Sequence, residues 1–431
     1  MKFKQLVLVG LPALALGILI GNLFFTPKHS TTRAYFDPDY WSGLGKVGEA
    51  MRLVHVRYVD EEKASFKNLS EAAISEVVNG LDKHSRYMSS SDFKDFELLS
   101  NRQYFGIGVS IFQLDENIMI TRVFSGGGAE AAGLRAGDRI LSVDAREITE
   151  RSVSEVSEII RGDIGTKVTL VLEDENGARR EAQVSRGKVQ LASVEDVRMI
   201  GGVGYLRIDQ FTGRTGEEFA SALAYLHQSG MQFLAIDLRD NSGGLLRAAV
   251  EVLGYFFKEG APVVSVDGRG REEKLVYRSE GQGRQSSVPT VILMNNGSAS
   301  ASEIVGGALQ VTGKAKLVGE SSYGKGSVQT IYPFDDGSGM KLTTARYYLP
   351  GGKTIGEEGL SPDVEVICDD ETLRKLRLQR DQDPFADPET FERRFGFAPV
   401  EDLPLLQALR IVKGEPIKEK EEENEVEPVE P

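Results

Sequence analysis

Short apolar runs alternate with helical patterns through the middle of this 431-residue chain. The apolar runs cover residues 203–208, 233–238 and 291–294, each of a length typical of a buried strand. Helical patterns lie between the runs, near residues 217–227 and 246–257. Strands that alternate with helices favour a sheet covered by helices, so this region predicts an α/β core. In such sheets the loops at the strand ends commonly hold the catalytic groups.

The composition is that of an ordinary globular protein, with 27% charged and 40% hydrophobic residues and enough length for about three domains. A net charge of -14 argues against nucleic acid as a partner, because there is no basic surface to neutralise phosphates. The single cysteine, Cys368, excludes an intramolecular disulfide and a cysteine-rich metal site. The four histidines are scattered without ligand spacing, so we expect no metal and no other cofactor.

The N-terminus contains a span of twenty uncharged residues, 6–25, preceded by Lys2 and Lys4. Twenty residues are about the length that crosses a bilayer, and the lysines ahead of the span place the following chain outside the cytoplasm. A cleaved signal peptide is an alternative, although no clear small-x-small cleavage site follows Phe25. We therefore expect residues 1–28 to be a membrane anchor or signal segment, with the remainder on the extracytoplasmic, periplasmic face.

Ser300 follows the apolar run 291–294 and precedes a helical pattern. A serine at a strand-to-helix turn exposes its hydroxyl beside free backbone N–H groups. The same segment also contains Ser298 and Ser302, and physical reasoning does not choose among the three. The ordinary structural alternative for serines before a helix is an N-cap.

Lys325 lies 25 residues beyond Ser300, between Gly324 and Gly326, which allow close approach of backbone. A lysine with an ordinary pKa of ~10.4 accepts a proton at neutral pH only when it is buried. A solvated lysine is the structural alternative. Together, Ser300 and Lys325 predict a serine nucleophile with a lysine base.

Four segments carry a resemblance to the carboxyl-terminal processing proteases, also called tail-specific proteases: residues 237–244, 295–304, 323–329 and 359–363. The similarity extends from about residue 40 to residue 370. It implies a multidomain α/β protein, with a serine-protease core of the crotonase/ClpP-like kind, an inserted PDZ domain and an N-terminal helical region. One departure is Ser242, where the family usually has proline, and we expect altered loop stiffness there.

The resemblance also assigns the catalytic roles. It selects Ser300 as the nucleophile and Lys325 as the base, with Gln329 orienting the lysine from the same face of a strand. The negative charge that develops on the attacked carbonyl needs N–H donors, and we expect these from Ala301 and from the turn of Gly243 and Gly244, with Gly243 preferred over Gly244. For Asp237 and Arg239 we expect a pair that stabilises the loop.

Residues 102–187 resemble a PDZ domain. A glycine-rich turn before an alternating strand provides backbone N–H groups for a peptide carboxylate, and the strand edge pairs with the peptide. The expected peptide-binding residues are Phe105, Gly106, Ile107 and Gly108. Residues 161–166 are similar to an Arg-Gly-x-x-Gly-Thr motif of the family, in which the arginine can link peptide binding to the catalytic site. The resemblance implies that role for Arg161, with a turn-stabilising surface arginine as the alternative.

The expected order of segments is a helical region (29–101), the PDZ domain (102–187), the protease core (188–370), a C-terminal helical region (371–414) and a disordered acidic tail (415–431). The predicted function is a serine endopeptidase that recognises the C-termini of extracytoplasmic proteins through its PDZ domain. The expected partners are peptides with a free C-terminus, the membrane and, as in relatives, a second copy of the chain. The alternatives are a non-catalytic membrane-anchored PDZ scaffold and an acyl-transfer enzyme that acts on a small molecule.

Overall fold

The computed structural model describes residues 35–416 apart from 101–102, 270–273, 286 and 382–386. The predicted N-terminal anchor and the acidic tail from residue 417 lie outside the described residues. No helix in the described part of the chain is both long and apolar enough to cross a membrane. The described residues divide into two compact units, of which the smaller comprises those within 35–95, 265–276 and 327–348.

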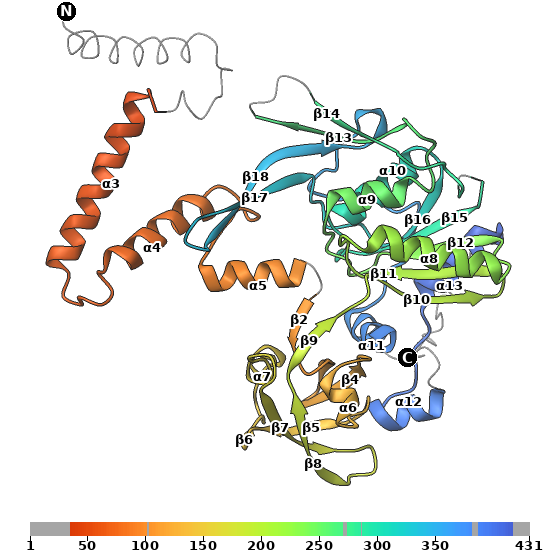
Figure 1. Cartoon of the computed structure of the whole chain (residues 1–431). Coiled ribbons are helices and arrows are strands. Elements are labelled where there is room, and N and C mark those ends of the chain that lie inside the picture. The colour runs from red at the N-terminus through yellow and green to blue at the C-terminus, as the bar shows by residue number, and fades with distance from the viewer. Residues whose placement is uncertain (1–34, 101–102, 270–273, 286, 382–386, 417–431) are drawn as a thin grey trace, which may run out of the picture. The chain divides into compact units, whose positions relative to one another are not determined.

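The smaller unit begins with two helices, α3 (Pro38–Arg57) and α4 (Phe66–Asn79) (Figure 1). Both helices have a side-chain cap, because Asp37 accepts a hydrogen bond from the Asp39 N–H and Ser65 accepts one from the Asn68 N–H. No residue of α3 is buried, and the large apolar side chains of Trp41, Leu44 and Val47 are exposed.

The sheet of this unit is built around the long strand β18 (Gly339–Tyr348). Strand β17 (Ser327–Pro333) pairs with it antiparallel, and β1 (Arg86–Met88) and β13 (Pro262–Gly268) also pair with it antiparallel. Strand β14 (Leu275–Arg278) lies beside β13. The region 29–101, expected to be helical, therefore also contributes one short strand.

The larger unit contains the predicted PDZ domain, whose sheet has the order β3-β4-β5-β7-β8. Its strands are β3 (Val109–Leu114), β4 (Asn117–Val123), β5 (Arg139–Val143), β7 (Lys167–Glu173) and β8 (Arg179–Ser185), with β6 (Arg146–Glu147) beside β5 and helices α6 (Gly128–Ala131) and α7 (Val153–Ile160). A cluster of buried aliphatic side chains fills this domain, including Ile120, Leu170 and Val184. Strand β2 (Gln103–Gly106) pairs with β9 (Gly187–Gln190) and brings the two ends of the domain together.

The core sheet of the larger unit has the order β10-β11-β12-β15-β16-β19. Its strands are β10 (Val194–Ile200), β11 (Val203–Ile208), β12 (Phe233–Asp237), β15 (Thr290–Met294), β16 (Ala315–Gly319) and β19 (Val364–Glu365), parallel from β11 to β19. Helices α8 (Thr215–Gln228), α9 (Leu246–Leu253) and α10 (Ala301–Val311) connect these strands. The predicted fold class, an α/β core with an inserted PDZ domain and N-terminal helices, is confirmed. The more specific crotonase/ClpP-like likeness stays a prediction.

Three helices follow the last core strand: α11 (Asp370–Asp381), α12 (Pro388–Phe395) and α13 (Leu403–Lys413). Helix α13 packs on β12, β15 and β16, where Ala408 and Val412 join a buried cluster with Ala235 and Leu293. The C-terminal helices are therefore part of the larger unit, and α13 helps to bury the central strands that lead into the predicted site.

Candidate active site

Ser300 lies between the end of β15 and the first residue of α10. Its backbone has φ 56° and ψ −112°, a left-handed conformation that side-chain-bearing residues rarely adopt. Such strain costs on the order of 1–3 kcal/mol and persists only where the surrounding structure holds it. Ala301 is the first residue of α10, and the N–H groups of a first helical turn have no acceptor within the helix.

The hydroxyls of the two neighbouring serines are engaged in structural hydrogen bonds. Ser298 Oγ donates to the Leu238 carbonyl at 2.7 Å, and Ser302 Oγ donates to the Asn241 carbonyl at 2.9 Å. Both serines are fully buried, whereas Ser300 is partly exposed. This arrangement supports Ser300 among the three serines that the sequence left open.

The glycine turn after β12 lies directly against Ser300. A Cβ added to Gly243 would lie 2.8 Å from the Ser300 Cβ and 2.7 Å from the Ala299 carbonyl oxygen, so only glycine fits. The Gly243 N–H donates to Asn241 Oδ1 at 2.8 Å. In this conformation the amide is already paired, and it must exchange that bond before it can bind an oxyanion.

Glu303 connects the backbones of Ser300 and Lys325. Its side chain is fully buried, and its Oε2 accepts hydrogen bonds from the Ser300 N–H at 2.7 Å and the Lys325 N–H at 3.0 Å. Its Oε1 accepts from Ser322 Oγ at 2.6 Å and from the Gly324 N–H at 2.7 Å. One carboxylate therefore holds the nucleophile turn and the lysine loop together. The sequence reasoning missed this role, although a serine followed three residues later by glutamate is a recognised helix-start pattern.

Gln329 belongs to β17 in the smaller unit. Its Nε2 donates to Ser327 Oγ at 2.9 Å and lies 3.4 Å from Thr343 Oγ1. The larger unit thus brings together Ser300, Ala301, Gly243 and the Lys325 backbone. The roles predicted for Lys325 and Gln329 stay predictions.

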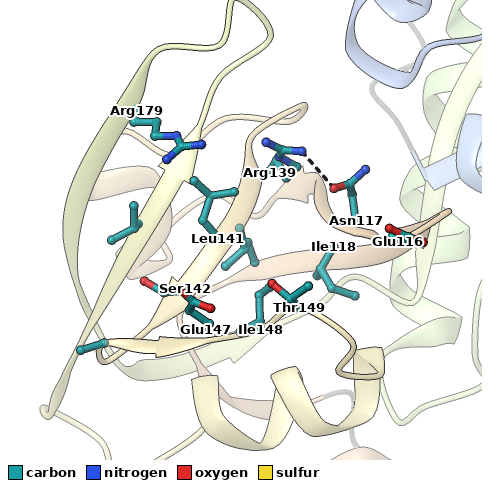
Figure 2. Close-up of a pocket in the computed structure, with 13 residues that line it drawn as sticks. Glu116, Asn117, Ile118, Arg139, Leu141, Ser142, Glu147, Ile148, Thr149 and Arg179 are labelled. Carbon is teal, nitrogen blue, oxygen red and sulfur yellow. Dashed lines mark hydrogen bonds between the residues drawn. The ribbon is translucent and has the colours of Figure 1, made fainter.

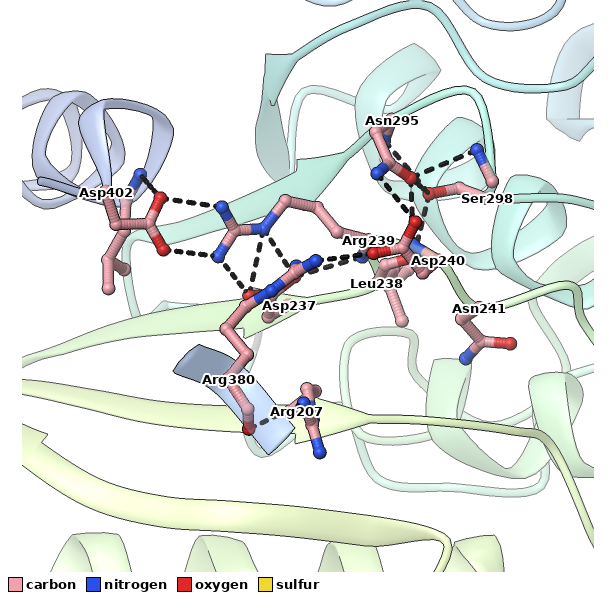
Figure 3. A network of polar contacts seen from close by, with 12 residues as sticks. Arg207, Asp237, Leu238, Arg239, Asp240, Asn241, Asn295, Ser298, Arg380 and Asp402 are labelled. Atoms are coloured by element: carbon pink, nitrogen blue, oxygen red, sulfur yellow. Dashed lines mark hydrogen bonds and ion pairs between the residues drawn. The ribbon is translucent and has the colours of Figure 1, made fainter. Parts of the chain in front are cut away.

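Asp237 and Arg239 form a buried ion pair behind the glycine turn, as expected (Figure 3). Burial alone would raise the pKa of Asp237, but the charge of Arg239 and its hydrogen bonds outweigh burial and hold that pKa well below its usual range. The Tyr205 hydroxyl also donates to Asp237, at 2.8 Å. Asp402, the N-cap residue of α13, accepts two further bonds from Arg239, at 2.7 and 2.9 Å.

The predicted peptide-binding turn leads into the edge strand of the PDZ sheet. Phe105 and Gly106 end β2, and Ile107 is buried in the domain core, where its carbonyl accepts a bond from the Ala129 N–H at 2.7 Å. Gly108 has φ +85°, and a Cβ there would lie 3.0 Å from another backbone. Strand β3 ends the sheet on this side, and α7 packs near it. The geometry is compatible with peptide addition to β3.

Arg161 is the exposed C-cap residue of α7. The arginine that fixes its turn is Arg186, which is buried and donates to the carbonyls of Ile159, Ile160 and Lys167 at 2.8–3.2 Å. A Cβ added to Gly162 would lie 2.8 Å from the Arg186 side chain. Arg186 was not predicted, because its partners are carbonyl groups that carry no sequence signal.

Two cavities lie outside the Ser300 region. One of about 560 Å³ is lined by the PDZ sheet, with Arg139 donating to Asn117 Oδ1 at 3.0 Å (Figure 2). The other, of about 450 Å³, is lined by Ser110 and Phe112 of β3 and by residues of the core and α11. No cluster of three or more histidine, cysteine or acidic side chains that could hold a metal occurs among the described residues.

Sequence models of "Peptidase family S41" and of the PDZ domain match residues 202–366 and 119–174. A Staphylococcus aureus (strain bovine RF122 / ET3-1) protein named as a probable CtpA-like serine protease is 32% identical over 361 residues, which cover 81% of this chain and 72% of the relative. A Staphylococcus haemolyticus protein of the same name is 31% identical and covers 85% of this chain and 73% of its own. A crystal structure of a Bacteroides fragilis protein assigned to the S41 proteases has a TM-score of 0.54 with 20% identity, covering 80% of this chain and 90% of that one.

Proposed function

The chain belongs to peptidase family S41 and is a serine-type carboxyl-terminal processing protease, and we propose that Ser300 is its nucleophile and Lys325 its base. The observation that carries this proposal is the Glu303 carboxylate, which accepts hydrogen bonds from the backbone of both residues. A shared acceptor keeps the two segments in register, and a nucleophile needs its base within hydrogen-bond reach.

In the proposed reaction, Ser300 Oγ attacks the scissile carbonyl carbon while neutral Lys325 takes the hydroxyl proton. The C–N bond then breaks, and Lys325 returns the proton to the leaving amine. A water molecule attacks the resulting ester with Lys325 again as base, which releases the new C-terminus and restores Ser300. The Ala301 N–H at the start of α10 stabilises the oxyanion, with a second amide from the Gly243 turn once its bond to Asn241 is exchanged. Gln329 orients Lys325.

Cleavage of an unstructured protein by the full chain tests this assignment. Ser300→Ala is expected to abolish cleavage, and Lys325→Arg to do the same, because arginine does not give up its proton. Ser302→Ala is the matched control and is expected to retain activity within about tenfold, since it loses a structural hydrogen bond only. A chelator should leave the rate unchanged. Wild-type cleavage by Ser300→Ala would refute the nucleophile, and a wild-type chain that binds peptides without cleaving anything would favour a non-catalytic PDZ scaffold.

The PDZ domain is proposed to bind substrate C-termini, with the peptide pairing to the edge of β3 beside α7 and its carboxylate at the turn 106–108. A peptide with a free carboxylate should bind the full chain, and the same peptide with a C-terminal amide should bind at least tenfold more weakly. Because Gly108 tolerates no side chain, this comparison changes the ligand rather than the protein. Equal affinity for both peptides would exclude carboxylate recognition.

The substrates are proposed to be extracytoplasmic proteins, because the uncharged span 6–25 follows two lysines.

A homodimer is proposed through α3, where Trp41, Leu44, Val47 and Leu53 are each at least 47% exposed. Leu44→Glu with Val47→Glu should convert a dimer to a monomer in light scattering of the full chain. A chain that is monomeric before substitution would remove the dimer proposal.

A further inference from the structure

Two arginines of α11 contact one carboxylate in the loop that follows β12. Arg380 is 11% exposed and its Nη2 contacts Asp240 Oδ2, while Arg377 is 51% exposed with its Nη2 2.9 Å from Asp240 Oδ1. Burial alone would raise the pKa of Asp240, but the charges of Arg380 and Arg377 lower it below its ordinary value. Asp240 is therefore an ionised group held mainly by the buried arginine (Figure 3).

Asp240 joins the two loops that carry the proposed catalytic groups. Its N–H donates to Asn295 Oδ1 at 2.8 Å, and its Oδ1 accepts from Asn295 Nδ2 at 3.1 Å. A Cβ added to Gly297 would lie 2.9 Å from the Asp240 Cα, so the two loops are in close contact. The next residue along, Asn241, accepts the Ala299 N–H at 3.0 Å through its carbonyl. A shift of Asp240 would therefore move the backbone that leads into Ser300.

We propose that Arg380 is a positioning residue for the Ser300 reaction, which acts through Asp240 and never touches the substrate. The proposal rests on the proposed function, since it takes Ser300 as the nucleophile. Asp240 and Ser300 both have positive φ, 62° and 56°, and such backbone keeps its conformation only when its surroundings hold it. Helix α11 begins at residue 370, beyond the 202–366 match to the peptidase family, so this contact comes from the chain's own C-terminal region.

The cavity of about 450 Å³ gives chemical access to this contact. Arg380 and Asp240 both line it, together with Ser110 and Phe112 of β3. Replacing Arg380 by alanine would enlarge the cavity beside a carboxylate that has lost its buried partner and still pairs with the exposed Arg377. A small planar cation such as guanidinium matches the geometry of a carboxylate and can fill that space.

The test measures hydrolysis of a short peptide substrate by the full chain. Arg380→Ala is expected to lower kcat about 10- to 100-fold with KM within about twofold, because a shift of about 1 Å in reacting groups has that effect on rate. Guanidinium at a few millimolar, far below denaturing concentrations, should restore part of kcat in Arg380→Ala and none in the wild type. The kcat of Arg380→Lys should lie between the values of the wild type and Arg380→Ala, because lysine keeps the positive charge but lacks the planar set of N–H donors of the guanidinium. Arg377→Ala is the matched control, one helical turn away on the same carboxylate, and should change kcat less than about threefold.

Three outcomes would overturn the proposal. These are a wild-type kcat in Arg380→Ala, an equal loss in Arg377→Ala, or a loss in Arg380→Ala that guanidinium does not restore while the variant stays folded. If Arg380→Ala fails to fold, Asp240→Asn takes its place, and a wild-type kcat in that variant would overturn the proposal equally. The Ser300→Ala variant tests the proposed nucleophile independently of Arg380. The failure of the proposed function and the failure of the positioning role of Arg380 can therefore be told apart.

Discussion

At the scale of single residues, the Glu303 side chain holds the segments of the candidate site together by hydrogen bonds. It is fully buried and accepts four hydrogen bonds, from three backbone N–H groups and one hydroxyl. Every one of its partners is a donor, so the site requires a side chain that only accepts. A carboxylate meets that requirement, and a carboxamide does not.

Glu303→Gln should therefore be damaging although it is nearly isosteric. Its amide group would face N–H donors, and we expect a loss of about 2–4 kcal/mol of stability together with at least a 100-fold fall in kcat. Urea unfolding and peptide hydrolysis measure the two effects. Glu251→Gln, in α9, is the comparison, because the Glu251 side chain is 41% exposed and pairs with the exposed Arg247. Wild-type kcat in Glu303→Gln would show that the shared acceptor is not needed.

Asp196 predicts a pH effect on stability. Burial raises the pKa of Asp196 to about 6, against the opposing charges of Arg198 and Arg207. The folded state then binds a proton more tightly than the unfolded state, so this group's contribution to stability falls as the pH rises from about 4 to about 6 and stays low above that. At pH 8, Asp196→Asn should raise the free energy of unfolding by at most about 3 kcal/mol. At pH 4 the same substitution should leave it almost unchanged.

Asparagine suits this exchange because Asp196 has φ 50°, and asparagine tolerates the left-handed region. Asp115→Asn is the matched control, since Asp115 has φ 54° and is exposed. Urea unfolding at both pH values gives the difference. Equal stabilisation at pH 4 and pH 8 would contradict the assignment to ionisation.

At the scale of elements, the turn after α7 depends on an arginine from another strand end. Arg186 follows β8, and its guanidinium donates to carbonyls at the end of α7. The last carbonyls of a helix have no partner within the helix. A buried cation at this end donates hydrogen bonds to them and interacts favourably with the negative end of the helix dipole. Arg161 lies in the same turn but is exposed.

Arg161 and Arg186 should therefore respond differently to substitution. Arg186→Met should cost about 2–4 kcal/mol because buried carbonyls lose their donors. Arg161→Ala should change stability by less than about 0.5 kcal/mol while it blunts activation of cleavage by added C-terminal peptides. Denaturant unfolding measures the stability of both variants, and the cleavage rate at increasing peptide concentration measures their activation. Unchanged activation in Arg161→Ala would leave that residue as a surface arginine that stabilises a turn.

At the scale of the whole molecule, the larger unit connects the PDZ sheet to the protease core through polar contacts. Thr121 of β4 donates to Asp381 at the end of α11, at 2.6 Å, and Arg122 is 2.6 Å from Glu195 of β10. Burial raises the pKa of Asp381, and the hydroxyls of Thr121 and Ser110 partly offset that effect. Asp381 is the neighbour of Arg380, so α11 contacts both the PDZ domain and the proposed catalytic loop.

Thr121→Val should weaken this connection in a pH-dependent way. Without the hydroxyl the pKa of Asp381 should rise further, so the loss of stability, about 1–3 kcal/mol, should be larger at pH 8 than at pH 5. Thr121→Ser keeps the donor and should behave like the wild type. Urea midpoints at the two pH values provide the measurement, and an equal loss at both would show that the carboxylate does not depend on this bond.

The sequence alone determined the features that depend on short windows. The apolar runs at 203–208 and 291–294 became β11 and β15 because the burial of a short strand is encoded in its own residues. The position of Ser300 at a strand-to-helix turn followed from the same local pattern. These are properties of neighbours in the chain.

Only the tertiary structure decided which distant groups meet. Arg239 reaches Asp402 and Arg380 reaches Asp240 across 163 and 140 residues, and no periodicity in the sequence specifies such a pairing. Glu303 looked like an ordinary helix-start residue until folding brought the Lys325 loop against it. A buried polar group must find a partner, but the packing of elements decides which one, and it is this packing that builds the proposed site.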